Sequence, residues 1–149
     1  MLRIHPDLYR EMLLQRAEYQ LDRELIVALW WVESRLNPLA VGDANMSAGL
    51  GQLYQGGAGA GYSLSALLEV STNARLSAQY LAKMISETGT VEDGLSAYNQ
   101  GLQGWRERGI AANRDYVQAI LNMRDKLKAE GLGQMGWPEL YYSWGNGEK

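Results

Sequence analysis

The sequence contains no cysteine and a single histidine, His5. Without cysteine the chain has no disulfide, no thiol nucleophile and no cysteine-ligated zinc or iron–sulfur site. One histidine also argues against a His-based catalytic triad or a site of clustered histidine ligands. We therefore expect no metal and no cofactor. Any catalysis has to use carboxylates, hydroxyls, amides or lysines.

Long apolar runs and an excess of basic residues are also missing. The longest apolar run, Leu25 to Val32, is far too short to cross a bilayer. Lys and Arg number 14 against 17 Asp and Glu, which makes nucleic-acid binding a poor hypothesis because phosphate contact needs a basic surface. A chain of 149 residues has the size of one domain, which we expect to be monomeric.

The first 20 residues mix charged and apolar side chains throughout. They contain neither the apolar core nor the small-residue cleavage site of a secretion signal. We expect that the protein acts where it is made or that another component carries it across the membrane.

Helical periodicity is the main pattern that is present. Apolar residues recur at helical spacing in five segments, and no sustained alternation typical of a strand is seen. The first segment opens at Pro6 and carries Leu8, Met12 and Leu13. The N-caps expected for the other four are Asp22, Ser71 or Thr72, Thr90 (in a capping box with Asp93, opening a short helix) and Asn113.

These segments predict one all-α domain, residues 1–130. An aromatic- and glycine-rich tail, residues 131–149, follows it. We expect the tail to pack the chain end onto the domain through Trp137, Tyr141, Tyr142 and Trp144. The alternative is that these aromatic side chains stack on sugar faces or dock a partner.

The second helical segment, residues 24–36, is apolar almost all round and must end by Asn37 because Pro38 follows. Such a helix belongs in the core. Glu33 lies in its last turns, where partial burial raises the pKa of a carboxyl group toward neutrality, the condition for a general acid at neutral pH. The alternative is that Glu33 points outward at a frayed helix end and pairs with Arg35 or Lys83.

Two more segments carry polar groups beside glycine. Residues 42–61 contain seven glycines, which is typical of a loop. Within this loop, residues 47–53 (SAGLGQL) allow the backbone to approach a ligand closely, and Gln52 offers a donor and an acceptor. In residues 97–101 (AYNQG) a helix stops and gathers Tyr, Asn and Gln near a turn. Each pattern alone is equally typical of an ordinary connection or helix C-cap.

Three motifs thus follow one another along the chain: Glu33-Ser34-x-x-Asn37-Pro38-x-Ala40, then Gly49-Leu50-Gly51-Gln52-Leu53, then Ala97-Tyr98-Asn99-x-Gly101. In this order they resemble the motifs of the soluble lytic transglycosylases of family 1, murein-cleaving enzymes grouped as glycoside hydrolase family 23 with goose-type lysozyme. Asn73 with Gln79-Tyr80-Leu81, and Tyr116-Val117, are similar to further motifs of that family. The resemblance implies a compact lysozyme-like helical domain with a long Gly-rich loop.

The resemblance also implies a reaction and the residues for it. Glu33 would act alone as acid and then base, cleaving the bond from N-acetylmuramic acid to N-acetylglucosamine and leaving 1,6-anhydromuramoyl ends. Support for Glu33 would come from Tyr98 or Tyr116, and from Ser34, which is equally placed to bond its own helix backbone. The substrate-binding residues would be Ser47, Gly49, Leu50, Gln52, Asn99 and Gln100.

Several positions depart from the family pattern. Gly42, Asp43 and Ala44 stand where a serine or two is usual, and Gly51 stands where methionine normally flanks the sugar. Tyr54-Gln55-Gly56-Gly57 replaces a Pro-x-Thr segment.

Asp43 opens an alternative, a lysozyme-like hydrolase in which this second carboxylate activates water. As a solvated turn residue it would have no such role. An alternative of another class is a non-catalytic murein-docking module of a virion or secretion apparatus.

The short chain is similar to transglycosylase domains of phage virions and to small secretion-system murein hydrolases. It would act on the bacterial cell wall, after release from the host cytoplasm by a holin or as a virion component, with peptidoglycan glycan strands as its main partner.

Overall fold

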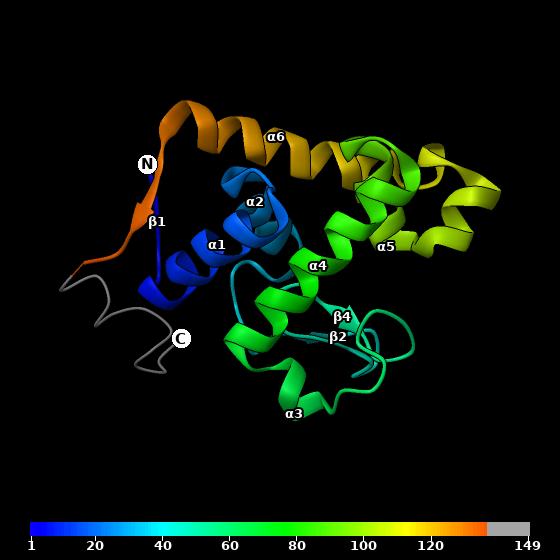
Figure 1. Cartoon of the computed structure of the whole chain (residues 1–149), viewed down its shortest axis with the longest axis horizontal. Helices are drawn as coiled ribbons and strands as arrows, with labels where there is room; N and C mark the ends of the chain where they lie inside the picture. Colours follow the sequence, from blue (N-terminus) through cyan, green and yellow to red (C-terminus); the bar gives the residue numbers. More distant parts are fainter. Residues whose placement is uncertain (137–149) are drawn as a thin grey trace.

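The computed structural model describes residues 1–136, and in this part of the chain the all-α class is confirmed (Figure 1). Its helices are α1 (Pro6–Tyr19), α2 (Arg23–Ser34), α3 (Leu64–Leu67), α4 (Val70–Thr88), α5 (Val91–Arg108), η1 (Ile110–Asn113) and α6 (Arg114–Glu130). Its short strands are β1 (Leu2–Ile4), β2 (Val41–Gly42), β3 (Ser47–Ala48), β4 (Leu53–Tyr54) and β5 (Leu132–Gln134). Helices α1, α4 and α6 surround α2, and the three strands β2–β4 lie beside α4 (Figure 1).

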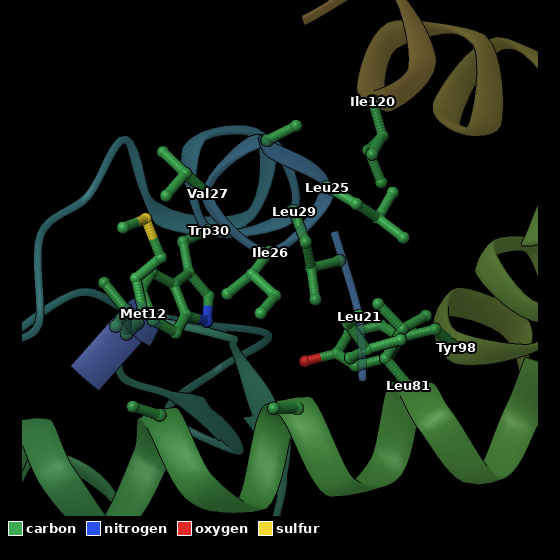
Figure 2. Close-up of a cluster of buried hydrophobic side chains, with 14 of the residues drawn as sticks. Met12, Leu21, Leu25, Ile26, Val27, Leu29, Trp30, Leu81, Tyr98 and Ile120 are labelled. Atoms are coloured by element: carbon green, nitrogen blue, oxygen red, sulfur yellow. The ribbon is translucent and has the colours of Figure 1, made fainter. Parts of the chain in front are cut away.

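Helix α2 forms the centre of the core, as its apolar sequence predicts. Its residues 25–30 are all buried, and side chains from α1, α4, α5 and α6 point toward them (Figure 2). Trp30 is fully buried, and its indole N–H donates to Oγ of Ser77 on α4 over 3.0 Å. A buried indole needs such an acceptor, so this bond fixes the rotation of α2 against α4.

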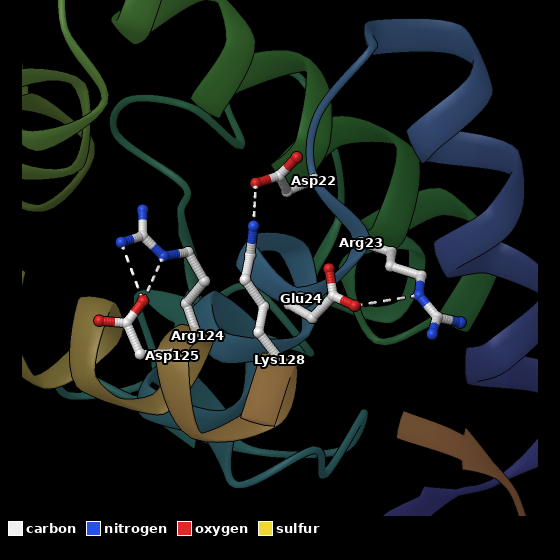
Figure 3. Close-up of polar contacts among 6 residues, drawn as sticks. All are labelled: Asp22, Arg23, Glu24, Arg124, Asp125 and Lys128. Carbon is white, nitrogen blue, oxygen red and sulfur yellow. Dashed lines mark hydrogen bonds and ion pairs between the residues drawn. The ribbon is translucent and has the colours of Figure 1, made fainter. Parts of the chain in front are cut away.

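The ends of α2 are set by charge and by backbone conformation. Asp22 precedes the helix as predicted, but its carboxylate pairs with Lys128 of α6 over 2.9 Å instead of capping an N–H group (Figure 3). At the other end, Arg35 and Leu36 adopt positive φ angles of 56° and 63°. The helix therefore ends at Ser34, before Pro38, as predicted.

The other predicted helices agree with the structure in position but not in every boundary. Thr90 caps α5 by accepting from the N–H of Asp93, as predicted. Helix α4 begins before the predicted caps, after Glu69, so Ser71 and Thr72 lie within it. Asn113 precedes α6 but bonds side chains and backbone of α5 instead of capping the helix.

Helix α5 and the first helix also differ from the prediction in detail. Helix α5 runs to Arg108 instead of stopping near Tyr98, with a kink at Gly101, whose φ of 82° is accessible to glycine at little cost. Leu13, expected on the apolar face of the first helix, is 39% exposed.

The glycine-rich segment is not all loop. Strands β2, β3 and β4 form a small antiparallel sheet, with Gly42 opposite Ser47 and Ala48 opposite Leu53. The turn between β2 and β3 contains three consecutive residues with positive φ, Asp43, Ala44 and Asn45. Two-residue strands lack the alternation by which sequence patterns reveal longer ones.

The two ends of the described chain meet in a second sheet. β1 pairs with β5 in parallel, Leu2 beside Leu132 and Ile4 beside Gln134 (Figure 1). Residues 132–134, placed in the predicted tail, thus pair with the first strand of the domain. The aromatic residues expected to pack the chain end lie in 137–149, outside the described residues. Within residues 1–136, no helix is both long enough and apolar enough to span a bilayer.

Candidate active site

A cleft of about 430 Å³ opens between the β2–β4 sheet and helices α2, α4 and α5. Glu33 from α2 and Asp43 from the β2–β3 turn contribute carboxylates to its lining. Most of the rest is polar or aromatic: Ser47, Gln52, Tyr54, Tyr80, Tyr98, Asn99 and Gln100. Flat aromatic faces beside amide and hydroxyl groups suit a carbohydrate, which presents apolar ring faces and many hydroxyls. In the described part of the chain, no group of three acidic or histidine side chains is arranged to hold a metal.

Among the carboxyl groups of residues 1–136, Glu33 is the one whose pKa burial shifts most. It lies half-buried at the end of the apolar helix α2, and its pKa is raised from 4.5 to about 7. Burial is the main cause, because desolvation disfavours the carboxylate; the nearby charge of Asp43 raises the pKa further, and a hydrogen bond from Tyr116 lowers it. The raised pKa predicted from the helix pattern is confirmed, and Glu33 does not pair with Arg35 or Lys83.

The two tyrosines that were expected to support Glu33 have different hydrogen-bond partners in the structure. Tyr116 of α6 donates its hydroxyl hydrogen to Oε2 of Glu33. Tyr98 of α5 instead donates to the carbonyl oxygen of Gly51 over 2.7 Å, although its ring lines the cleft. Burial raises the pKa of both phenols well above 10, so both remain protonated donors at neutral pH.

Side chains from three helices hold the backbone between β3 and β4. Asn73 of α4, 1% exposed, accepts from Gly51 N–H over 2.7 Å and donates to the carbonyl oxygens of Ala48 and Leu67. Ser34 Oγ lies 2.7 Å from the carbonyl oxygen of Leu50 and 3.0 Å from that of Trp30, so it bonds its own helix and the loop. Together with the bond from Tyr98, these contacts fix the course of residues 48–51 against α2, α4 and α5.

Glycines 49 and 51 make this close approach possible. A Cβ at Gly49 would lie 2.2 Å from the carbonyl oxygen of Leu67, and φ there is 81°. A Cβ at Gly51 would lie 2.4 Å from Cβ of Ser77 and 2.7 Å from the hydroxyl of Tyr98. The Cβ direction at Gly51 therefore points into the protein, and the space where the family's methionine would begin is filled by α4 and α5.

Not all of the predicted substrate-binding residues reach the cleft. Gly49 and Leu50 do not line it, and Leu50 is fully buried, so the cleft gives no support to the prediction that they contact substrate. Gln100 lines the cleft, but its Nε2 is already bonded to Ser96 Oγ and to the carbonyl oxygen of Gly109, both over 2.9 Å. Its role in this structure is to hold the kink of α5.

Ser47, Gln52 and Asn99 do line the cleft. Gln52 uses Nε2 to bond the carbonyl oxygens of Ala40 and Gly49, which leaves Oε1 as its available acceptor. Ser47 donates to Asp43 over 2.7 Å, and Asn99 accepts from Asn113 over 2.8 Å. Their contact with a substrate stays a prediction.

Sequence reasoning missed two aromatic residues of the cleft. Tyr80 of α4 lines it and packs against Tyr98 with ring centroids 5.2 Å apart. Tyr54 of β4 also lines it and is 49% exposed. Tyr80 belonged to a segment similar to a further motif of the family but received no site role, and Tyr54 lies in a two-residue strand without a pattern of its own.

Replacing Tyr116 by phenylalanine should raise the pKa of Glu33 above about 7, because the hydrogen bond from Tyr116 is what lowers it. A reaction that needs protonated Glu33 should then keep its rate to a higher pH, so the alkaline limb of the kcat/KM profile moves up. The rate at the optimum should fall, by less than for Glu33→Gln, since the carboxyl loses its orienting partner. Profiles of cell-wall clearing against pH measure both effects.

Tyr98→Phe is the matched control, since Tyr98 bonds Gly51 and not Glu33. The midpoint of its alkaline limb should equal that of the parent protein, even if the substitution changes the stability of the fold. A Tyr116→Phe profile that coincides with that of the parent would rule out support of the acid by Tyr116.

The buried helix that ends in a carboxyl group facing a cleft, inside a shell of helices, belongs to a lysozyme-like fold, as the following comparisons show. The chain belongs to the transglycosylase SLT domain family, whose model matches residues 13–118. Among solved structures it is similar to an inactive mutant of the lytic transglycosylase Slt from Pseudomonas aeruginosa, in which glutamine replaces a glutamate. The TM-score is 0.65 at 23% identity over 88% of this chain, which covers 26% of the Slt chain. No curated protein matches the sequence.

Proposed function

We propose that the chain is a peptidoglycan lytic transglycosylase that cleaves murein glycan between N-acetylmuramic acid and N-acetylglucosamine, with Glu33 as its single acid and base. The observation that carries this proposal is the carboxyl group of Glu33, whose pKa of about 7 lets both protonation states exist at neutral pH. Membership of the transglycosylase family supports it. So does the similar structure, which is of a Glu-to-Gln mutant described as inactive.

In the proposed reaction Glu33 takes part in two proton transfers, first as an acid and then as a base. Protonated Glu33 donates to the glycosidic oxygen, and the bond from that oxygen to C1 of the muramoyl sugar breaks. The C6 hydroxyl of the same sugar then bonds to C1, and its proton passes to the Glu33 carboxylate, which restores the acid. The products are a free N-acetylglucosamine hydroxyl and a 1,6-anhydro ring, and no water is consumed. Tyr116, hydrogen-bonded to Oε2, would hold the carboxyl group through both transfers.

A hydrolase is the second candidate, and one observation favours it. Asp43 lines the same cleft as Glu33, and its charge contributes to the raised pKa of Glu33. A carboxylate across the cleft is where an inverting enzyme holds the base that activates water. Against this role, Asp43 already accepts a hydrogen bond from Ser47 and lies in an open turn.

Product analysis and Asp43→Asn together distinguish the two reactions. For the transglycosylase, digestion of purified cell walls should give anhydromuropeptides, one water lighter than reducing ends by mass spectrometry. Asp43→Asn should keep most activity, with the alkaline limb of its pH profile moved slightly down because a charge that raises the pKa of Glu33 is gone. Asparagine still offers Ser47 an acceptor, so the turn should be retained. Reducing-end products, with activity lost in Asp43→Asn, would establish the hydrolase.

A non-catalytic docking module would bind murein without cleaving it, and the same assay detects this case. The relation to goose-type lysozyme, the phage setting and any virion or secretion partner stay predictions from the sequence resemblance.

A further inference from the structure

The guanidinium group of Arg108, the last residue of α5, is held beside the cleft by a residue of its lining. Its Nε donates to Oε1 of Gln100 over 3.2 Å. Because Nε2 of Gln100 is bonded to Ser96 and Gly109, the amide cannot turn, and the direction of Oε1 is set. An exposed arginine usually samples many rotamers, but this one has its head group bonded to Gln100, a residue of the cleft wall.

The position of this guanidinium also depends on a glycine, which leaves space that a side chain would fill. Gly104 lies one turn before Arg108, and a Cβ there would lie 2.5 Å from Nη2 of Arg108. Arg108 therefore lies across the helix surface at the point where glycine leaves room.

Arg108 has no acidic partner within residues 1–136. Its neighbour Arg106, by contrast, pairs with Glu87 over 4.0 Å. The planar guanidinium presents its two Nη groups in a geometry that matches a carboxylate. The carboxylates of the cleft itself are Glu33 and Asp43, which would repel an anion bound near them. The cleft thus suits uncharged sugars at its centre and a negative group at the edge formed by the α5 kink.

We propose that Arg108 binds a carboxylate of the peptides attached to muramoyl residues and makes the protein selective for murein whose peptides carry free carboxylates. This inference rests on the proposed function, because murein strands are uncharged along their sugars and carry their carboxylates on these peptides. Arg108 is then a specificity residue: it contacts the substituent, and Glu33 does the chemistry.

The test compares two substrates, soluble peptide-bearing glycan strands and the same strands after the carboxylates of their peptides have been coupled to methylamine and so converted to neutral amides. The parent protein should show the lower KM on the strands with free carboxylates, and rising salt should increase that KM because an exposed ion pair is screened. In Arg108→Gln the ratio of the two KM values should fall toward 1, by about threefold to tenfold, and most of the salt dependence should vanish. Values of kcat should change much less, since no transferred proton passes through Arg108.

Two further variants separate charge recognition from support of the helix end. Arg106→Gln removes a charge of the same helix turn that is already paired, and its KM ratio should match the parent protein. Gly104→Ala keeps the charge of Arg108 but displaces the guanidinium, so the ratio should fall.

An unchanged ratio in Arg108→Gln, or equal increases of KM on both substrates, would overturn the inference and leave the proposed function standing. If the parent protein neither cleaves nor binds either substrate, both the inference and the proposed function are overturned.

Discussion

Replacement of Glu33 by glutamine is expected to abolish murein cleavage while the fold is retained. Glutamine has the shape of the carboxyl group but cannot donate or take up the transferred proton. General acid–base catalysis contributes about 10²–10⁴ in rate, and here one residue supplies both the acid and the base. Loss of turbidity of purified cell walls measures the rate.

The same variant should also be more stable than the parent protein above pH 7. The pKa of Glu33 is about 7 in the folded state against an ordinary value of 4.5, so the folded state holds this proton more tightly. As pH rises from about 4.5 to 7 the unfolded chain has lost the proton that the folded chain still binds, and stability falls. Above pH 7 the glutamine variant should gain about 1–3 kcal/mol in free energy of unfolding, and this gain should shrink toward pH 4.5.

Denaturant unfolding at pH 5 and pH 8 therefore provides a control for the activity assay. A variant that is inactive, folded and stabilised only at the higher pH places the defect in proton transfer. Clearing at close to the parent rate would remove Glu33 from the catalytic role.

Replacement of Asn73 by alanine should give the largest loss of stability among the polar residues of the site. Asn73 is 1% exposed and bonds Gly51 N–H and the carbonyl oxygens of Ala48 and Leu67. Alanine would leave three buried backbone groups without their partner, each at a cost of about 1–3 kcal/mol before water enters the space. We expect a loss of about 3 kcal/mol or more in free energy of unfolding, measured by urea denaturation.

Asn122→Ala is the matched control, since Asn122 is exposed on α6 and, within residues 1–136, its side chain forms one hydrogen bond, to the side chain of Gln118. It should change stability by less than about 0.5 kcal/mol. Because Asn73 holds the loop that leads to Gln52, the folded fraction of Asn73→Ala should also cleave murein more slowly. Equal unfolding midpoints for the two variants would show that the Asn73 contacts contribute nothing.

The sequence alone determined what depends on neighbours along the chain. The apolar residues 25–32 required a buried helix, and Pro38 required its end within a few residues. A carboxyl group at the end of such a helix had to be partly desolvated, so the direction of the pKa shift of Glu33 followed from the helix pattern itself. The cap formed by Thr90 was also predictable, because its partner Asp93 lies only three residues away along the chain.

Only the tertiary structure decided which groups meet across the chain. Tyr98 and Tyr116 were equivalent candidates in the sequence, but the packing of α6 on α2 brings Tyr116 to Glu33, 83 positions away. Likewise, the position of α4 beside the loop brings Asn73 to the N–H of Gly51, 22 positions away, and Leu50 is buried in the same region. A hydrogen bond requires two atoms to meet within about 3 Å, and between distant residues that distance is set by how helices pack, which no local pattern of residues encodes.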